Sequence, residues 1–218
     1  MRLIRGGAII GALKGLIILI RKDGVYYRGY PSVGGTMPDC DWPGNDELMK
    51  RYHDEEWGKS NHSDRVHFEF LILEGAQAGL SWKTILHRRE GYKKAFYNYN
   101  WDKVAWMTEK DVERLLKDPG IIRNRMKINS AINNAKRFIV IREEFGSFDK
   151  YLWHFTDGKV INNKPQSLKE LPATTELSEK ISKDLKMRGF SFVGSTVIYA
   201  HLQAVGVVND HLAGCSLK

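Results

Sequence analysis

The sequence has few cysteines and no apolar run long enough to cross a membrane. Only two of its 218 residues are cysteine, Cys40 and Cys215, which excludes a disulfide-rich scaffold and favours a reducing compartment. The longest apolar stretch, residues 8–20, is broken by Lys14 and is too short to span a bilayer comfortably. We therefore expect a cytoplasmic protein that has no membrane partner.

The first 36 residues differ from the rest of the chain in charge and composition. They hold six basic residues and one acid, and so supply +5 of the formal net charge of +8. Residues 37–218, with 28 basic and 25 acidic residues, carry only +3, so global charge argues weakly for a polyanionic partner. We expect residues 1–36 to be an extension to the domain. It is either translated in error because the true start is Met37, or it is a targeting segment. Residues 37–218 are expected to form one helical domain.

Helical spacing dominates the sequence from Asp46 onward. Apolar residues recur three and four positions apart within residues 66–77, 115–138 and 193–205. Residues 156–175, with Asp-Gly, Asn-Asn and two prolines, predict a polar loop. Because no alternating strand pattern and no repeat is evident, the fold class is predicted to be all-α. Helix N-caps are predicted at Asp46, Ser63, Ser81, Thr108 and Ser147.

Both cysteines and two of the seven histidines have a spacing that suits a metal site. His211 and Cys215 are four residues apart, which places them on one helix face, and Cys40 and His53 are thirteen apart near the other end of the domain. Two Cys and two His ligands complete a tetrahedral, structural Zn²⁺ site that would join the two ends. The alternative is two unrelated thiols and two ordinary histidines.

A catalytic zinc is not favoured by the same residues. His53-Asp54-Glu55 matches the H-x-E half of a zinc deaminase signature, but the P-C-x-x-C half is missing and no H-E-x-x-H occurs. A catalytic zinc also needs an open coordination position, which four protein ligands do not leave.

Glu74 is a candidate catalytic acid because of what surrounds it in the sequence. It follows the apolar residues 70–73 and precedes small residues and then Trp82. Since burying an unpaired carboxylate is costly, Glu74 should have partners or a raised pKa. The small residues Gly75, Ala76, Ala78 and Gly79 let a neighbouring helix or a DNA strand approach the backbone closely. The alternative is a structural acid that caps a helix or pairs with an arginine.

Residues 113–125 predict a helical hairpin with a tight Pro119-Gly120 turn. A glycine turn at a helix N-terminus presents N–H groups to a phosphate, which favours binding of a nucleic-acid backbone. The alternative is an ordinary hairpin with solvated basic faces. Basic residues that would support phosphate binding are Arg123, Arg125, Lys127, Lys136 and Arg137, with a second run at Lys180, Lys183, Lys186 and Arg188.

Six motifs in order resemble the 3-methyladenine DNA glycosylase I family of the helix-hairpin-helix superfamily. They are YHDEEWG at 52–58, LEGAQAGLSW at 73–82, LHRRE at 86–90, PGIIR at 119–123, RGFSFVG at 188–194 and VNDHLAGC at 208–215. The likeness runs from about Met37 to Cys215. It implies a helix-hairpin-helix glycosylase fold and hydrolysis of the N-glycosidic bond of 3-methyladenine in alkylated double-stranded DNA, by base flipping, in base-excision repair.

The resemblance also implies roles for individual residues. Glu74 would be catalytic and contact the flipped base, Tyr52 and Trp82 would stack on it, and Trp42 and Trp57 would line the pocket. Where the family often has Tyr, three residues before Tyr52, this chain has Met49, so one pocket wall is expected to be less polar. Further implied contacts are DNA-binding by Gly120, Arg123, Arg125 and Leu80, and Zn²⁺ binding by Cys40, His53, His211 and Cys215.

We expect a monofunctional hydrolase, because no nucleophilic lysine for a lyase reaction stands out after the hairpin. We also expect this hydrolase to be a monomer and to act on nucleoid DNA. Two other functions stay open at this point. A zinc-stabilised helical module could bind DNA without releasing a base, and a zinc hydrolase or deaminase could act on free nucleobases. Salt-dependent DNA binding without base release would indicate the first of these alternatives.

Overall fold

The computed structural model describes residues 10–13, 16–21, 24–28 and 40–217, which fall into two compact units, residues 1–36 and 37–218. In the first unit, β1 (Ile10–Leu13), β2 (Leu16–Arg21) and β3 (Gly24–Arg28) form an antiparallel sheet. Ile10 pairs with Leu19, and Arg21 pairs with Gly24. These strands were not expected, because a short continuous apolar run has no period that separates a strand from a helix.

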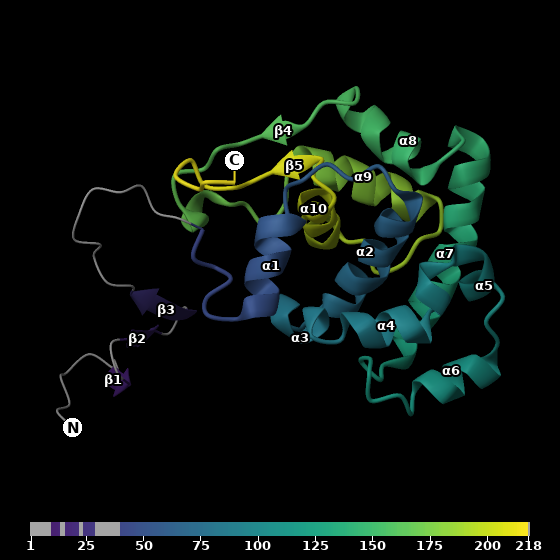
Figure 1. Ribbon diagram of the computed structural model, residues 1–218, viewed down its shortest axis with the longest axis horizontal. Helices are drawn as coiled ribbons and strands as arrows, with labels where there is room; N and C mark the ends of the chain where they lie inside the picture. Colours follow the sequence, from purple (N-terminus) through teal and green to yellow (C-terminus); the bar gives the residue numbers. More distant parts are fainter. Residues whose placement is uncertain (1–9, 14–15, 22–23, 29–39, 218) are drawn as a thin grey trace. The chain divides into compact units, whose positions relative to one another are not determined.

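The second unit is mostly helical, as the spacing predicts (Figure 1). A short parallel pair, β4 (Ile161–Asn162) with β5 (Val208–Asn209), supplements the helices, together with the 3₁₀ helices η1 (Tyr97–Tyr99), η2 (His154–Thr156) and η3 (Leu168–Glu170). The α-helices are α1 (Glu47–Glu55), α2 (Asp64–Gln77), α3 (Trp82–Leu86), α4 (Arg89–Ala95), α5 (Trp101–Ala105), α6 (Glu109–Leu115), α7 (Arg125–Phe145), α8 (Phe148–Trp153), α9 (Glu176–Met187) and α10 (Ser195–Ala204).

Local capping explains where several of these helices begin. Asp46 Oδ1 accepts hydrogen bonds from the N–H groups of Leu48 and Met49, and Thr108 forms a capping box with Asp111. The predicted caps Ser81 and Ser147 also accept backbone N–H groups, whereas Ser63 stands at its N-cap without a side-chain bond. The helix boundaries near the site are therefore encoded locally.

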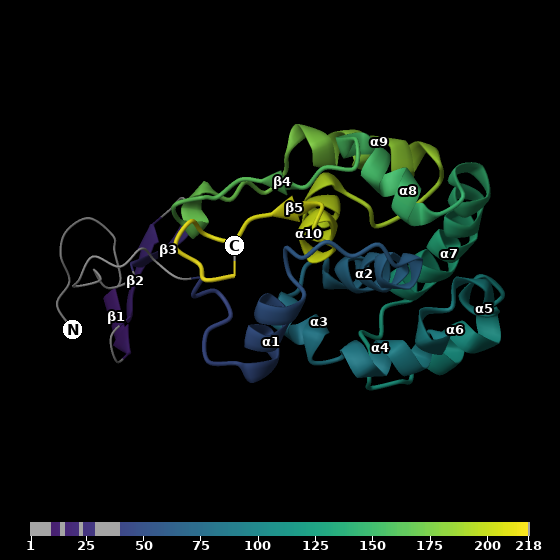
Figure 2. The same ribbon diagram turned by 45° about the horizontal axis from the view of Figure 1, so that its top comes forward.

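Helix α2 lies inside the helical unit, with α7 and α10 beside it (Figures 1 and 2). Every residue from Phe70 to Ala76 is buried, so this half of the helix is surrounded by protein on all sides rather than along one stripe. Phe68 and Leu73 are completely buried, and Phe138 of α7 packs against Phe68 with ring centroids 5.1 Å apart. Glu74, near the C-terminal end of α2, is consequently carried into the interior.

The predicted loop at 156–175 is held against the C-terminal segment. Ile161 pairs with Val208, and the N–H of Ala213 donates to the carbonyl of Pro165 at 2.9 Å. The sequence does not indicate β4 or η3 within this loop, because each is a single turn or pair fixed by tertiary contact. Within the part of the chain that the structure describes, no helix has the length and apolar character needed to cross a membrane.

Candidate functional site

A pocket of about 250 Å³ brings together all five residues predicted to meet a flipped base. Tyr52 comes from α1, Glu74 from α2 and Trp82 from α3, while Trp42 and Trp57 precede and follow α1. Residues separated by forty positions therefore share one cavity. The remaining lining residues are Gln77, Leu168, Leu171, Ala200 and Gln203.

The aromatic rings give the pocket flat walls. The ring centroids of Tyr52 and Trp82 are 5.1 Å apart, and Trp42 meets Trp57 edge to face at 5.3 Å. Burial, with a further contribution from nearby Glu74, raises the pKa of Tyr52 well above its usual range, so its hydroxyl stays neutral. Aromatic faces in such a site favour a planar, positively charged ligand.

Glu74 is the only acid that lines this pocket, and it is 3% exposed. Burial raises the pKa of its carboxyl to about 8, and no hydrogen-bond partner for it occurs among residues 40–217. Two buried indole N–H groups that line the same cavity, on Trp42 and Trp82, likewise lack a hydrogen-bond partner. Unsatisfied buried polar groups are costly, so this pocket is built for a polar ligand.

The four predicted metal ligands form one buried cluster at the junction of the two ends of the domain. The nearest side-chain N and S atoms of Cys40, His53, His211 and Cys215 all lie within 4.8 Å of one another. His211 Nδ1 is 3.8 Å from Cys40 Sγ and 3.4 Å from Cys215 Sγ. A tetrahedral ion with bonds of about 2.0–2.3 Å separates its ligands by roughly 3.6 Å, so the cluster has the dimensions of a metal site.

Neighbouring groups orient the two histidines of this cluster. His53 Nδ1 lies 2.6 Å from the carboxylate of Asp54, and His211 Nε2 lies 3.0 Å from the carbonyl oxygen of Trp57. These bonds leave His53 Nε2 and His211 Nδ1 facing the sulfurs. Such outer partners are typical of histidines that bind metals.

The metal cluster and the pocket share walls. The Trp42 ring lies 5.5 Å from the His53 ring, and the Trp57 ring lies 4.8 Å from the His211 ring. Leu168 of η3 lines the pocket and also packs against the apolar residues around the cluster. Displacement of the cluster would therefore move pocket walls.

The predicted hairpin is present between α6 and α7, and its turn is held by hydrogen bonds within the protein. The N–H of Gly120 donates to Asp118 Oδ1 at 2.7 Å, and the N–H of Ile122 donates to the Tyr92 hydroxyl at 3.1 Å. The Gly120 N–H is thus already engaged. The first intrahelical bond of α7 runs from Ile128 N–H to the Asn124 carbonyl, which leaves earlier N–H groups at the helix N-terminus.

The predicted DNA-contacting side chains lie at the surface and differ in whether they are paired with an acidic residue. Arg125 is paired with Glu109 and Glu113, whereas Arg123 is exposed and pairs with no acid among the described residues. Leu80, in the turn between α2 and α3, is 41% exposed.

The comparisons with known proteins agree with this geometry. The family model described as Methyladenine glycosylase matches residues 42–218. The chain belongs to the methyladenine glycosylase family. It is 44% identical to "DNA-3-methyladenine glycosylase 1" of Escherichia coli (strain K12), over 82% of this chain and 96% of that protein. It is 40% identical to "DNA-3-methyladenine glycosylase" of Haemophilus influenzae, over 82% of this chain and 97% of that protein.

A solved structure of another family member has a similar fold. The 3-methyladenine DNA glycosylase I of Staphylococcus aureus, determined in a study of 3-methyladenine recognition, superposes with a TM-score of 0.81 at 35% identity. The match covers 84% of this chain and 98% of that one. The predicted family is therefore confirmed.

In the present chain, Met49 does not lie where the sequence predicts. Met49 is buried in the core, and it is not among the residues that line the pocket. Met49 therefore belongs to the packing behind the site rather than to a pocket wall. Leu168 and Leu171 do line the pocket, but a polar loop gives no periodic signal that could have identified them.

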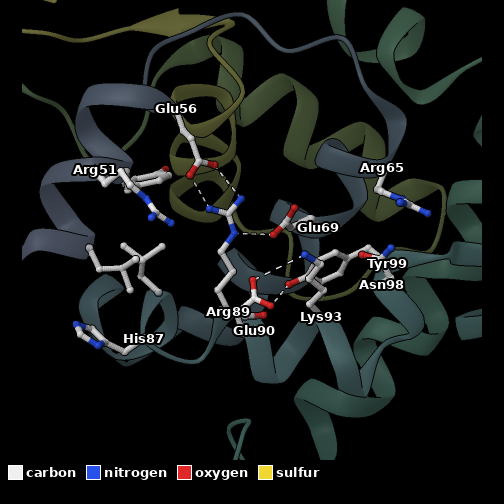
Figure 3. Close-up of a pocket in the computed structure, with 13 residues that line it drawn as sticks. Arg51, Glu56, Arg65, Glu69, His87, Arg89, Glu90, Lys93, Asn98 and Tyr99 are labelled. Atoms are coloured by element: carbon white, nitrogen blue, oxygen red, sulfur yellow. Dashed lines mark hydrogen bonds and ion pairs between the residues drawn. The ribbon is translucent and has the colours of Figure 1, made fainter.

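Sequence motifs also gave no role to Arg89. Its guanidinium donates to both carboxylate oxygens of Glu56, at 2.7 and 2.8 Å, and to Glu69 at 2.6 Å (Figure 3). This network lines a second cavity of about 460 Å³, which Tyr52 also borders. Arg89 thus ties α4 to α2 and to the end of α1, next to the aromatic wall.

Gly91 of α4 is essential for the position of the hairpin, because the two backbones touch there. A Cβ at Gly91 would lie 2.1 Å from the carbonyl oxygen of Gly120, so the turn would have to move.

We expect Gly91→Ala to cost about 1–3 kcal/mol in the free energy of unfolding and to weaken DNA binding. Chemical denaturation and fluorescence anisotropy with duplex DNA measure the two effects. Gly194→Ala, where a Cβ meets nothing within 4 Å, is the control, and equal behaviour of both variants would contradict the prediction.

Proposed function

We infer that this chain is a DNA-3-methyladenine glycosylase, which hydrolyses the N-glycosidic bond of 3-methyladenine in alkylated DNA and so begins base-excision repair. The relatives from Escherichia coli and Haemophilus influenzae carry the names of this activity over nearly their whole lengths. The observation that carries the inference is Glu74, a buried carboxyl facing an aromatic slot of about 250 Å³. A methylated purine fits such a slot.

The charge of the substrate explains why this slot suits it. An adenine methylated at N3 in DNA is cationic, and cleavage of its bond to the sugar releases a neutral base. Contact with the faces of Tyr52 and Trp82 contributes roughly 0.5–2 kcal/mol each for a cation. The ionised Glu74 accepts a hydrogen bond from the exocyclic amine and balances the charge. Water then attacks C1′ of the sugar and releases a proton to solvent, and the electron pair of the broken bond neutralises the base.

The substrate base has to leave the double helix before it can enter the pocket. Extrusion costs a few kcal/mol and is easiest for damaged bases. We propose that the exposed Leu80 occupies the space left in the duplex, because it lies two residues before the pocket wall Trp82. Its apolar side chain would stack there against the neighbouring bases.

The hairpin would hold the phosphate backbone while the base is extruded. We propose that Arg123 and the N–H groups at the start of α7 bind phosphate, with Gly120 shaping the turn and the paired Arg125 stabilising the α6–α7 junction. In this arrangement the N–H of Gly120 does not donate to phosphate, because it already donates to Asp118.

Arg123→Ala should weaken binding of duplex DNA and reduce the slope of log affinity against log salt by about 1, because one phosphate contact is lost. Titrations at several salt concentrations measure both quantities. Arg65→Ala is the control, since Arg65 is exposed at the N-terminal end of α2, whereas the loop that carries Leu80 follows the C-terminal end of that helix. An unchanged salt slope in Arg123→Ala would reject the phosphate contact.

We propose that the Cys₂His₂ cluster binds one structural Zn²⁺ through His53, His211 and the two cysteine thiolates. Four protein ligands leave no position for substrate, so the ion would supply stability and no catalytic step. Thiolate ligands persist best in a reducing compartment, which supports a cytoplasmic enzyme acting at the nucleoid. We also propose that it acts as a monomer, because one chain supplies every wall of the pocket.

The activity is tested by chromatography of the bases that the purified protein releases from methylated duplex DNA. We expect 3-methyladenine to be released while 7-methylguanine stays in place. Binding of DNA with salt dependence but without release of any methylated base would instead indicate a non-catalytic DNA-binding module.

A further inference from the structure

Lys127 links the hairpin to the base pocket through two hydrogen bonds. Its ammonium group donates to the carbonyl oxygens of Ala76 and Ala78, each at 2.7 Å. Both carbonyls stand at the C-terminal end of α2, where carbonyls lack partners within the helix and a cation is favoured. The two acceptors flank Gln77, which lines the pocket.

The segment that Lys127 holds contains functional side chains on both sides. Glu74 lies less than one turn before Ala76, and the exposed Leu80 lies two residues after Ala78. Between them the chain reverses direction, with Gly79 in a left-handed conformation and a 2.6 Å bond from Leu80 N–H to the Gln77 carbonyl. Lys127 therefore contacts the backbone where the pocket ends and the exposed loop 78–81 begins.

The other side of the link is the hairpin. Lys127 is the third residue of α7, and its own N–H donates to the side chain of Asn124, the last residue of the turn, at 3.1 Å. One residue thus joins the α7 N-terminus to the loop that carries Leu80. Burial lowers the pKa of the Lys127 ammonium below its usual value, which agrees with its position between backbone segments.

The two helices do not need this lysine in order to pack together. The buried face of α7, including Ile128, Ile132 and Phe138, already lies in the common core with α2. The ammonium acts on the irregular segment beyond the end of α2, which has no core side chain of its own between Gln77 and Ser81.

We propose that Lys127 is a positioning residue for excision, which fixes loop 78–81 and the edge of the pocket at a set distance from the phosphate-binding hairpin. This inference rests on the proposed DNA contact of the hairpin. A duplex needs the hairpin, the inserted Leu80 and the pocket in register at the same time, whereas the free base needs only the pocket. The loss of Lys127 should therefore affect excision from duplex DNA and spare binding of the free base.

The test is Lys127→Met, which keeps the length of the side chain and removes its donors. We expect single-turnover release of 3-methyladenine from methylated duplex DNA to fall about tenfold or more, since a displacement of about 1 Å can cost a hundredfold. Affinity for free 3-methyladenine, followed by tryptophan fluorescence, should stay unchanged. Lys150→Met, which removes an exposed lysine on α8, controls for the lost charge, and Lys127→Arg should restore most of the release.

Three outcomes would overturn the proposal: release by Lys127→Met at the wild-type rate, an equal loss in Lys150→Met, or a matching loss of affinity for the free base. If Lys127→Met does not fold, Lys127→Gln, which removes the positive charge and shortens the side chain, gives the same comparison. Failure of the hairpin as a phosphate site would show instead in Arg123→Ala, through an unchanged salt slope, and failure of the glycosylase activity would show as no release by the wild-type protein.

Discussion

Glu74→Gln is expected to reduce release of 3-methyladenine from methylated DNA by about a hundredfold or more while leaving the protein folded. The amide keeps the shape of the side chain and removes the negative charge that faces the cationic base. Loss of one group that stabilises developing or existing charge in a buried site typically costs 10²–10³ in rate. Single-turnover assays at saturating enzyme measure the loss, and circular dichroism confirms the fold.

The dependence on pH gives a second signature of the same residue. Burial raises the pKa of Glu74 to about 8, so in the empty pocket its carboxyl is mostly protonated below that pH. If the carboxylate is the active form, kcat/KM should rise about tenfold per pH unit toward pH 8 and then level off, because kcat/KM reports ionisations of the free enzyme. Glu74→Gln should lack this rise.

Glu143→Gln is a matched control for both measurements, because Glu143 is an exposed carboxyl on α7. It should release base at the wild-type rate with the wild-type pH profile. Undiminished release by folded Glu74→Gln would remove the carboxylate from the mechanism, and the aromatic walls alone would then have to account for recognition.

Removal of the metal is expected to have the second large effect, this time on stability. Purified protein should contain one zinc per chain by elemental analysis, and a chelator or Cys215→Ser should lower the thermal midpoint by roughly 10 °C or more. The binding free energy of a structural zinc is folding free energy, and 1 kcal/mol shifts the midpoint of a domain of this size by about 2–4 °C. Because Trp42 and Trp57 contact His53 and His211, tryptophan fluorescence should change as well.

His62→Asn is the control for the metal experiment, since His62 is exposed, does not belong to the cluster, and places its Nδ1 3.0 Å from Asp149 Oδ1. His53→Asn should behave like Cys215→Ser. A wild-type protein that holds no metal, and whose thermal midpoint a chelator does not change, would contradict the proposed site and leave the cluster as a set of packed polar side chains.

The sequence and its resemblance to the family named the four residues of the Cys₂His₂ cluster and the five residues predicted to meet the base, and the structure brings each group together. Residue type and spacing suggested that Cys40, His53, His211 and Cys215 form one site, and the resemblance implied the same four ligands. The structure places all four in one cluster. The predicted hairpin was also found, since Pro119-Gly120 between two helical patterns encodes the turn locally.

What the sequence did not reveal depends on contacts between distant segments. Leu168 belongs to a polar loop and lines the pocket only because β4 pairs with β5. Gly120 was expected to offer its N–H to phosphate, but Asp118 already accepts that group, which only the fold of the turn decides. The Arg89 network joins residues that are 20 and 33 positions away, and no local pattern encodes such pairs.

The buried carboxyl of Glu74 also sets a direction for evolution in the laboratory. Unfolded, this group loses its proton near pH 4.5, and folded it keeps the proton to about pH 8. Because the pKa is raised in the folded protein, the free energy of unfolding falls as the pH rises between these limits. Above pH 8 the full loss of stability, on the order of a few kcal/mol, is present. Selection for thermal stability alone, at neutral or alkaline pH, would therefore favour variants in which Glu74 is replaced. Such variants would be more stable but would no longer repair DNA.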